Sequence, residues 1–197
     1  MTRHLNRCSQ PKALVAAGKR QTTPAFHLVV EGRWVKAYWI HLAAPVKAPL
    51  SKLDDFLRHI WLECCGHMSA FEIEGIRYFC SPMEKEERGM ETPLSQVVNA
   101  GTKFFYEYDF GSTTELGLKV VGFWNQGTPK GAVQLLARND PPEVICAQCE
   151  THLATQVCIA CEDAWLCESC AAAHDCGEEM FLPVVNSPRV GVCGYTG

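Results

Sequence analysis

The first 140 positions of the chain are dominated by short stretches of β-branched and aromatic residues that are bounded by turn residues. Glu31-Gly32 and Glu74-Gly75 each separate two such stretches, a pattern that predicts two β-hairpins. The strands expected from this pattern span residues 26–30, 34–42, 70–73, 76–79, 103–108, 116–124 and 132–137. The hairpins indicate a mostly antiparallel sheet.

One segment has helical periodicity instead. After Ser51, apolar residues recur at the spacing of one helix face. These residues are Leu53, Phe56, Leu57, Ile60 and Trp61. Ser51 and Asp54 have the spacing of a capping box, and Gly66 is a suitable stop signal. The prediction is an α+β fold in which one principal helix packs against the sheet.

The last quarter of the chain is rich in cysteine. Three Cys-x-x-Cys pairs and one His-x-Cys pair lie between residues 146 and 176. Structural zinc takes four thiolate or imidazole ligands in a tetrahedral arrangement, so eight donors predict two closed zinc sites. The short spacing between the second and third pairs favours interleaved ligation. The expected sites are Cys146, Cys149, Cys167 and Cys170 for the first ion, and Cys158, Cys161, His174 and Cys176 for the second.

Other interpretations of these donors remain open. Cys193 could replace Cys176 or His174 in the second site, and His152 is another spare donor. A disulfide framework is the competing interpretation of the cysteines. We favour metal binding because no signal-peptide pattern precedes the cysteines and four further cysteines lack paired spacing. Few apolar residues are available in this region, so chelation should unfold residues 146–197 and leave the larger domain intact.

The cysteine-rich segment resembles the B-box and ZZ-type zinc modules. Both families have Cys-x-x-Cys pairs at similar spacings and end in a short pair that contains His. Those families more often place His where this chain has Cys176. The resemblance covers the last quarter of the chain. It implies a small treble or cross-brace domain that is stabilised by two structural zinc ions.

The larger region resembles the plasmid pRi ORF-three-like family, whose members are also passengers of mobile elements. The matching features are Phe71-x-Ile73, Gly75-x-x-Tyr78, Leu94 in a short helix and Tyr106-Glu-Tyr-Asp-Phe-Gly111. Family members commonly continue with an acidic pair, a Trp and a His, whereas this chain has Ser112-Thr-Thr-Glu-Leu116. The resemblance covers about residues 25–138. It implies the fold of this region and an association with mobile elements, and it assigns no activity.

These features divide the chain into four parts. The expected parts are a basic flexible arm at 1–24, the α+β domain at 25–138, a linker at 139–143 and the two-zinc module at 144–197. With 197 residues, 47% of them hydrophobic, the chain can hold one mid-sized domain and one small one. The net charge of −4 gives no general attraction to nucleic acid. No apolar run reaches the roughly 20 residues of a membrane helix, so we expect a cytoplasmic protein.

Two groups outside the zinc region are candidates for other chemistry. Asp109 and Glu107 lie near the end of a strand, where a carboxylate could act as acid, base or ligand. Asp109 precedes Phe-Gly, and it is better suited to bonding turn amides. Cys64, Cys65 and His67 could supply metal ligands, or a nucleophile and its base. Adjacent cysteines do not converge easily on one ion and no third ligand of suitable spacing is near, although Cys80 and His59 are possible additions, so we favour packing roles.

The chain is therefore expected to be a non-enzymatic zinc protein that acts by binding a partner. The many acidic residues after Cys146 favour a basic peptide or a basic surface of a partner protein. The alternative is a nucleic-acid-associated factor that uses the basic arm and an aromatic sheet surface. The aromatic residues are Trp34, Tyr38, Trp39, Trp61 and Trp124. A second alternative is an enzyme of unknown class that uses Asp109 or Cys65 in a cleft.

Overall fold

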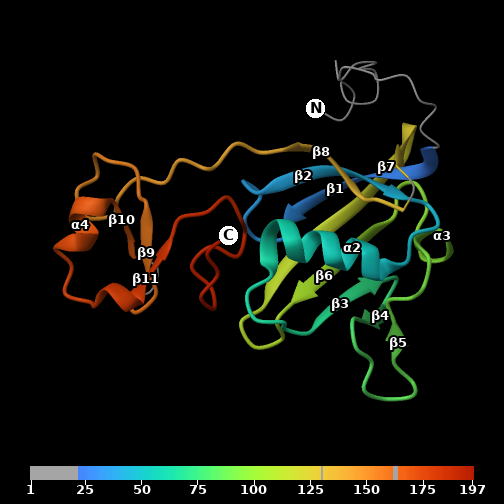
Figure 1. Ribbon diagram of the computed structural model, residues 1–197, viewed down its shortest axis with the longest axis horizontal. Coiled ribbons are helices and arrows are strands. Elements are labelled where there is room, and N and C mark those ends of the chain that lie inside the picture. Colours follow the sequence, from blue (N-terminus) through green and yellow to red (C-terminus); the bar gives the residue numbers. More distant parts are fainter. Residues whose placement is uncertain (1–21, 130, 162–163) are drawn as a thin grey trace.

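A computed structural model describes residues 22–129, 131–161 and 164–197. In these ranges, a large sheet with one main helix is joined through an extended segment to a small cysteine-rich module (Figure 1). The predicted α+β class with an appended zinc-type module is confirmed. Most of the basic arm expected at 1–24 lies outside the described residues, and its last three residues belong to the first strand.

The large sheet has eight strands in the order β5-β4-β3-β6-β7-β1-β2-β8. Neighbouring strands are antiparallel, except that β4 and β5 are parallel. The strands are β1 (Thr22–Gly32), β2 (Trp39–Pro45), β3 (Ser69–Ile73), β4 (Ile76–Phe79), β5 (Arg88–Gly89), β6 (Lys103–Tyr108), β7 (Thr114–Pro129) and β8 (Gln134–Arg138). Strand β7 is longer than predicted because it pairs with β1 along nearly its whole length.

Both predicted hairpins are present in the large sheet. The turn between β3 and β4 uses the left-handed backbone of Gly75, which has a φ of 77°. Strand β2 begins at Trp39 rather than at residue 34, because the chain first folds back tightly over Gly32. A Cβ atom at Gly32 would lie 2.7 Å from the carbonyl oxygen of Val35. Trp34 consequently lies in the connecting loop, with 75% of its surface exposed.

The principal helix packs across one face of the sheet (Figure 1). It begins as α2 (Leu50–Leu57) and continues as a π-helical turn, η1 (Arg58–Leu62). Leu53, Leu57 and Trp61 of the predicted apolar stripe are fully buried. A second short helix, α3 (Leu94–Val97), adds the buried Leu94 to the same core. No helix within the described ranges has the length and apolarity needed to span a membrane.

The predicted capping box at the start of this helix is wrong. The N-cap residue is Pro49, and no side chain caps the helix. Instead, the backbone amides of the first two helical residues donate to the carbonyl oxygens of Thr92 and Met90. Because a neighbouring loop supplies these acceptors, the orphan amides need no side chain from Ser51 or Asp54.

Asp54 has a different role, since its carboxylate lies in the core and is only 5% exposed. Its Oδ1 atom accepts hydrogen bonds from the hydroxyls of Ser69 at 2.7 Å and Tyr106 at 2.6 Å. Its Oδ2 atom accepts from the Arg58 guanidinium at 2.9 Å. Burial, followed by the neighbouring Asp54 charge, raises the pKa of Tyr106 well above its ordinary value. Asp54 therefore joins the helix to strands β3 and β6.

The small module contains a three-stranded antiparallel sheet in the order β10-β9-β11. Its elements are β9 (Gln156–Cys158), β10 (Ala164–Leu166), α4 (Glu168–Ala172), η2 (Glu178–Met180) and β11 (Phe181–Pro183). A buried cluster contains Cys146, Leu166, Cys167 and Ala171, with Cys149, Ala164, Cys170 and Phe181 packed against it, and Val157 and Cys158 of β9 are also fully buried. Half of these side chains are cysteines, so the core of the module is built around sulfur atoms.

After β11 the chain returns to the large sheet (Figure 1). The side chains of Asn139 and Asn186 bond one another at 2.8 Å, which ties the start of the expected linker to this tail. The Ser187 hydroxyl donates to the carbonyl of Trp61 at 2.6 Å. Arg189 is fully buried, and its guanidinium donates to the Asp109 carboxylate at 2.8 Å. The C-terminal tail is therefore part of the larger domain's packing.

Replacing Asp54 by Ala should lower the free energy of unfolding of the larger domain by about 2–4 kcal/mol, because two hydroxyls lose their buried acceptor and Arg58 keeps only one of its two carboxylate partners, Glu63. Urea unfolding followed by tryptophan fluorescence measures the loss. Asp55 is the matched control, since its exposed carboxylate faces only Lys52 at 3.6 Å. Asp55→Ala should stay within about 0.5 kcal/mol of wild type. A loss near 1 kcal/mol for Asp54→Ala, the size of a cap effect, would contradict this role.

Candidate metal centre

The module brings eight Cys and His residues together in two groups of four. Within each group, the four ligand atoms, each a sulfur or a ring nitrogen, all lie within 4.8 Å of one another. The first group is Cys146, Cys149, Cys167 and Cys170, and the second is Cys158, Cys161, His174 and Cys176. The structure thus gathers the two interleaved sets that the sequence spacing predicts.

A tight turn and the start of a helix position the first group. The Cys146 carbonyl accepts a hydrogen bond from the amide of Glu150, whose φ is 55°. This turn folds the segment back and brings Cys149 near Cys146. Cys167 is the N-cap residue of α4, and Cys170 lies within the first turn of that helix. Residues three apart on a helix share one face, so both of these sulfurs can reach the same ion.

The second group joins the end of β9 to the segment after α4. Cys158 is the last residue of β9. The Cys161 sulfur lies 3.4 Å from the Cys176 sulfur and 3.4 Å from Nε2 of His174. The His174 ring also packs edge-on against Phe181, with 5.6 Å between ring centroids. This contact helps to hold the imidazole in an orientation that presents Nε2 to the three sulfurs.

The spacing of the donors fits a tetrahedral ion. Sulfur ligands about 2.3 Å from tetrahedral zinc lie about 3.8 Å from one another. In the first group, the sulfurs of Cys149 and Cys167 are 3.8 Å apart. Four thiolates, or three thiolates and one imidazole, are the donor sets that soft metal ions such as zinc prefer. Both groups could therefore hold a metal ion.

Crowding of the sulfurs opposes ionisation of each whole group in the absence of a cation. Contacts with Cys167, together with burial, raise the pKa of Cys170 to about 12. Contacts with Cys161 and Cys158 likewise raise the pKa of Cys176 to about 12. Only some thiols in each group can lose a proton unaided. A divalent ion removes this repulsion, because it attracts every thiolate at once.

The two further donors considered for the second group, His152 and Cys193, do not belong to it. Nδ1 of His152 is 3.5 Å from the Cys149 sulfur and 3.1 Å from the Thr151 hydroxyl, so His152 borders the first group and not the second. The hydrogen bonds of Thr151, followed by those of His152, lower the pKa of Cys149 to about 4. Cys193 is not among the donors gathered around His174.

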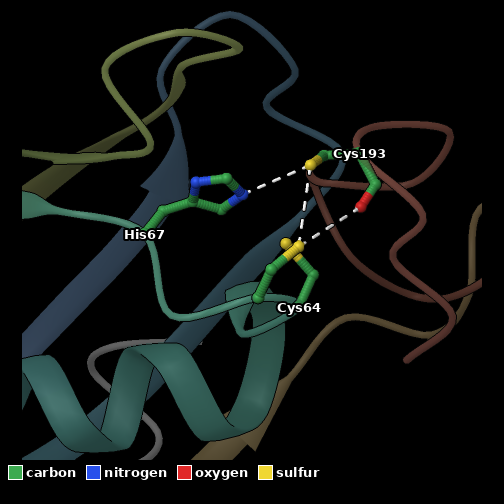
Figure 2. Close-up of side chains that lie close together, drawn as sticks. Cys64, His67 and Cys193 are labelled. Atoms are coloured by element: carbon green, nitrogen blue, oxygen red, sulfur yellow. Dashed lines mark hydrogen bonds between the residues drawn. The ribbon is translucent and has the colours of Figure 1, made fainter.

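Cys193 instead completes a third group, with Cys64, Cys65 and His67 of the larger domain, whose ligand atoms also lie within 4.8 Å of one another. Figure 2 shows Cys64 and His67 facing Cys193 on the C-terminal tail. The sequence marked Cys64, Cys65 and His67 as candidate donors, with Cys80 and His59 as possible additions, but neither addition belongs to this group. The fourth donor is 126 residues from His67, and only the tail packing brings it close.

The hydrogen bonds of Asp109 give this residue a structural role. Its Oδ1 atom accepts from the amides of Gly111 at 3.0 Å and Ser112 at 3.2 Å, as predicted for a turn aspartate. Its Oδ2 atom pairs with Arg189. Burial opposes ionisation of Asp109, but the Arg189 and amide bonds outweigh it and lower the pKa of the carboxyl. An ionised carboxylate held in this way is poorly suited to proton transfer.

The structure also changes the interpretation of Cys65 and of the predicted aromatic residues. Contacts with Cys64 and Cys193 raise the pKa of Cys65 to about 11, so without a cation it is a thiol and not a thiolate nucleophile at neutral pH. Trp61 and Tyr38 are buried in the core. Among the predicted aromatic residues, Trp34 is well exposed. The five residues therefore do not form one stacking surface.

Comparisons with known proteins inform the fold alone. No protein-family model matches the chain, and a search of curated proteins found no match. Among solved structures, the chain is similar to a Methanosarcina mazei Go1 protein described as a protein of unknown function, MM3350. The identity is 14%, the TM-score is 0.50, and the match covers 61% of this chain and 72% of that one. The resemblance to the plasmid pRi ORF-three-like family stays a prediction.

Metal removal should unfold the module without unfolding the large sheet, because the module's core is half cysteine and bound metal would supply much of its folding free energy. Hydrogen–deuterium exchange with and without a strong chelator measures this. The amides that close the small sheet, including those of Thr155, Ile159 and Val184, should exchange at least about 100-fold faster after chelation. Amides shared by β1 and β7 should be unaffected.

Cys167→Ser should give the same loss of module protection without chelator. Cys80→Ser is its control, because the Cys80 sulfur accepts bonds from the Ser69 amide and the Arg58 guanidinium and belongs to none of the three groups. Module amides that stay protected in chelator would show that the small sheet folds without metal and would contradict the prediction.

Proposed function

We propose that this chain is a non-enzymatic zinc-binding protein whose C-terminal module binds a basic segment of a partner protein. Two structural zinc ions would fold the module, one in each of its four-donor groups. Each group offers four protein donors to one tetrahedral ion, and a site filled in this way leaves no position for a catalytic water. The module would therefore act through its surface.

The charge of the module supports a basic partner. The chain has no Lys or Arg between Arg138 and Arg189. Acidic side chains are spread along the same stretch. Among the described residues of this stretch, the exposed acids are Asp140, Glu143, Glu150, Glu168, Asp175, Glu178 and Glu179. Such a surface repels phosphates and other polyanions, and it attracts cationic peptides over a distance set by the ionic strength.

The observation that carries the proposal is a groove on the module with an acidic rim. A hollow of about 360 Å³ lies between α4 and β11, and a second hollow continues from it along β11. Glu168, Glu178 and the half-buried Phe181 line both hollows. Lys and Arg side chains have an apolar stem and a cationic end, so one such side chain could pack on Phe181 and pair with either glutamate. His174 and Cys176 also line the groove, so its shape depends on the second metal group.

The proposal predicts that the zinc-loaded protein binds a fluorescent peptide of alternating Lys and Ala, and that binding weakens as salt is raised. Replacing both Glu168 and Glu178 by Gln should weaken this binding about tenfold, or about 1.4 kcal/mol, because two exposed charge contacts are lost. Fluorescence anisotropy at two salt concentrations measures the affinity.

Glu150→Gln is the matched control, because Glu150 is an exposed acid of the same module that does not line the groove. It should leave the affinity within about twofold of wild type. An equal loss in the control and in the groove variant would mean that net charge alone attracts the peptide. Tighter binding to an alternating Glu and Ala peptide would overturn the proposal.

A second candidate function rests on a separate surface of the large sheet. A hollow of about 380 Å³ crosses β6, β7 and β1, and Lys36, Lys103 and Lys119 line it together with the exposed Phe105. The Arg33 guanidinium lies 4.3 Å from the centroid of the Phe105 ring. Cationic groups around an exposed ring are the elements with which proteins bind single-stranded nucleic acid. Glu31 also lines this hollow and pairs with Lys36, which reduces the positive charge.

If this surface binds nucleic acid, the affinity for a fluorescent poly-U oligonucleotide should fall steeply with salt. The Lys103→Ala and Lys119→Ala double variant should lower the logarithmic salt slope by about 1–2, since each lysine contributes one phosphate contact. Lys47→Ala is the control, because Lys47 lies in a different hollow. An unchanged slope in the double variant would rule out this surface.

A further inference from the structure

The donors of the third group come from two segments that are far apart in sequence. Cys64, Cys65 and His67 follow the principal helix, in a turn where Gly66 has a φ of 76°. The Glu63 carboxylate accepts from the Gly66 amide at 2.5 Å and from the Tyr108 hydroxyl at 3.0 Å. The turn is thus fastened to the sheet. The left-handed glycine reverses the chain, so His67 faces the same space as the two cysteines.

The fourth donor comes from the C-terminal tail, which is held in a series of tight turns. The amides of Val190, Val192 and Tyr195 each donate to the carbonyl oxygen three residues earlier. Cys193 has a φ of 50°, a left-handed conformation that costs of order 1 kcal/mol for a residue other than glycine. A residue kept in this conformation needs a compensating interaction. Here its sulfur lies 3.2 Å from Nε2 of His67 and 3.8 Å from the Cys65 sulfur (Figure 2).

We propose that Cys64, Cys65, His67 and Cys193 form a third metal site, for a zinc-class divalent ion, that fastens the C-terminal tail to the larger domain. Three thiolates and one imidazole are a standard donor set for structural zinc. Thiolates on one tetrahedral zinc lie about 3.8 Å apart, which is the distance between Cys65 and Cys193. The site goes beyond the two ions of the module, and it does not depend on which partner the module binds.

The positive charge of Arg189 would stabilise a metal site of negative net charge at this position. Three thiolates and one divalent ion leave a net charge of −1. The buried Arg189 guanidinium lies beside the group and donates to the Cys64 sulfur at 3.5 Å. It also donates to Asp109 and to the hydroxyl of Thr114, and these bonds fix its position. The same side chain thus anchors the tail and places a positive charge next to one ligand.

Two other uses of these residues fit the geometry less well. In a nucleophile–histidine–carboxylate triad, the sulfur and the carboxylate contact opposite ring nitrogens. Here Cys193 and Asp109 both approach Nε2 of His67, at 3.2 and 3.6 Å, so Asp109 cannot orient the ring for Cys193. A Cys65–Cys193 disulfide would use two of the four donors and leave Cys64 and His67 beside it without a role. A metal ion uses all four.

Elemental analysis of the full-length protein, purified with a non-metal-binding reductant and dialysed against zinc-free buffer, tests the proposal. Wild type should contain about three zinc ions per chain, and Cys65→Ser and Cys193→Ser should each contain about two. Cys80→Ser should keep all three, as a thiol outside the groups. The two test positions are both exposed and lie on different segments, so loss of one ion in both variants does not reflect misfolding of one element.

Hydrogen–deuterium exchange supplies a second readout. In both test variants the amides of Val190, Val192 and Tyr195 should exchange at least about tenfold faster, while the amides of β9 and β11 keep wild-type protection. A zinc content of two in wild type would overturn the proposal, as would a third ion that survives both substitutions. In protein purified without reductant, an intact mass lower by two hydrogens, with Cys65 and Cys193 joined, would replace the metal site with a disulfide.

Discussion

The mutual repulsion of its gathered sulfur atoms, which a bound cation would relieve, is the interaction around which the cysteine-rich module is organised. Its core is too small to fold by apolar burial, because cysteines supply half of it. The same sulfurs repel one another once ionised, as the raised pKa values of Cys170 and Cys176 indicate. A zinc ion bound in each group would reverse the sign of this interaction, and structural zinc contributes about 10–16 kcal/mol to the folding of zinc-finger peptides.

The tail couples this module to the sheet through buried polar groups. Arg189 is a fully buried cation, so its bonds to Asp109, Thr114 and the Ser112 carbonyl are needed to offset its loss of hydration. Together with the turn amides that the sequence predicted as its partners, the bond from Arg189 gives Asp109 a structural role. The segment that carries Arg189 brings Cys193 to the donors at the end of the principal helix.

The chain has two surfaces of opposite charge, which the net charge alone does not reveal. Lysines surround Phe105 on the open face of the large sheet. Glutamates surround Phe181 on the module. In each case an apolar ring lies among charges that are mainly of one sign, although Glu31 also lines the lysine hollow. This arrangement suits a ligand with an apolar part and the opposite charge. Because the surfaces lie on different parts of the chain, one molecule could bind two unlike partners.

Local patterns in the sequence determined the α+β class, both hairpins, the buried stripe of the principal helix and the two interleaved donor sets. Each of these depends on the spacing of residues along the chain. Side chains on one face repeat every two residues in a strand and about every 3.6 residues in a helix, and a Cys-x-x-Cys turn presents a pair of ligands. Other features depend on residues that are far apart in the sequence, and only the tertiary structure decided them. Neighbouring carbonyls capped the principal helix and freed Asp54 to bond across the core.

The third donor group shows most clearly what local sequence spacing cannot predict. Cys64, Cys65 and His67 form an incomplete ligand set when only nearby residues are considered. Cys193 is equally compatible with the second module site on sequence spacing alone. The buried pairing of Arg189 with Asp109 settles the position of the tail, and therefore the partners of Cys193. The sequence determined which side chains could bind metal, and the packing of a distant charge decided which of them meet.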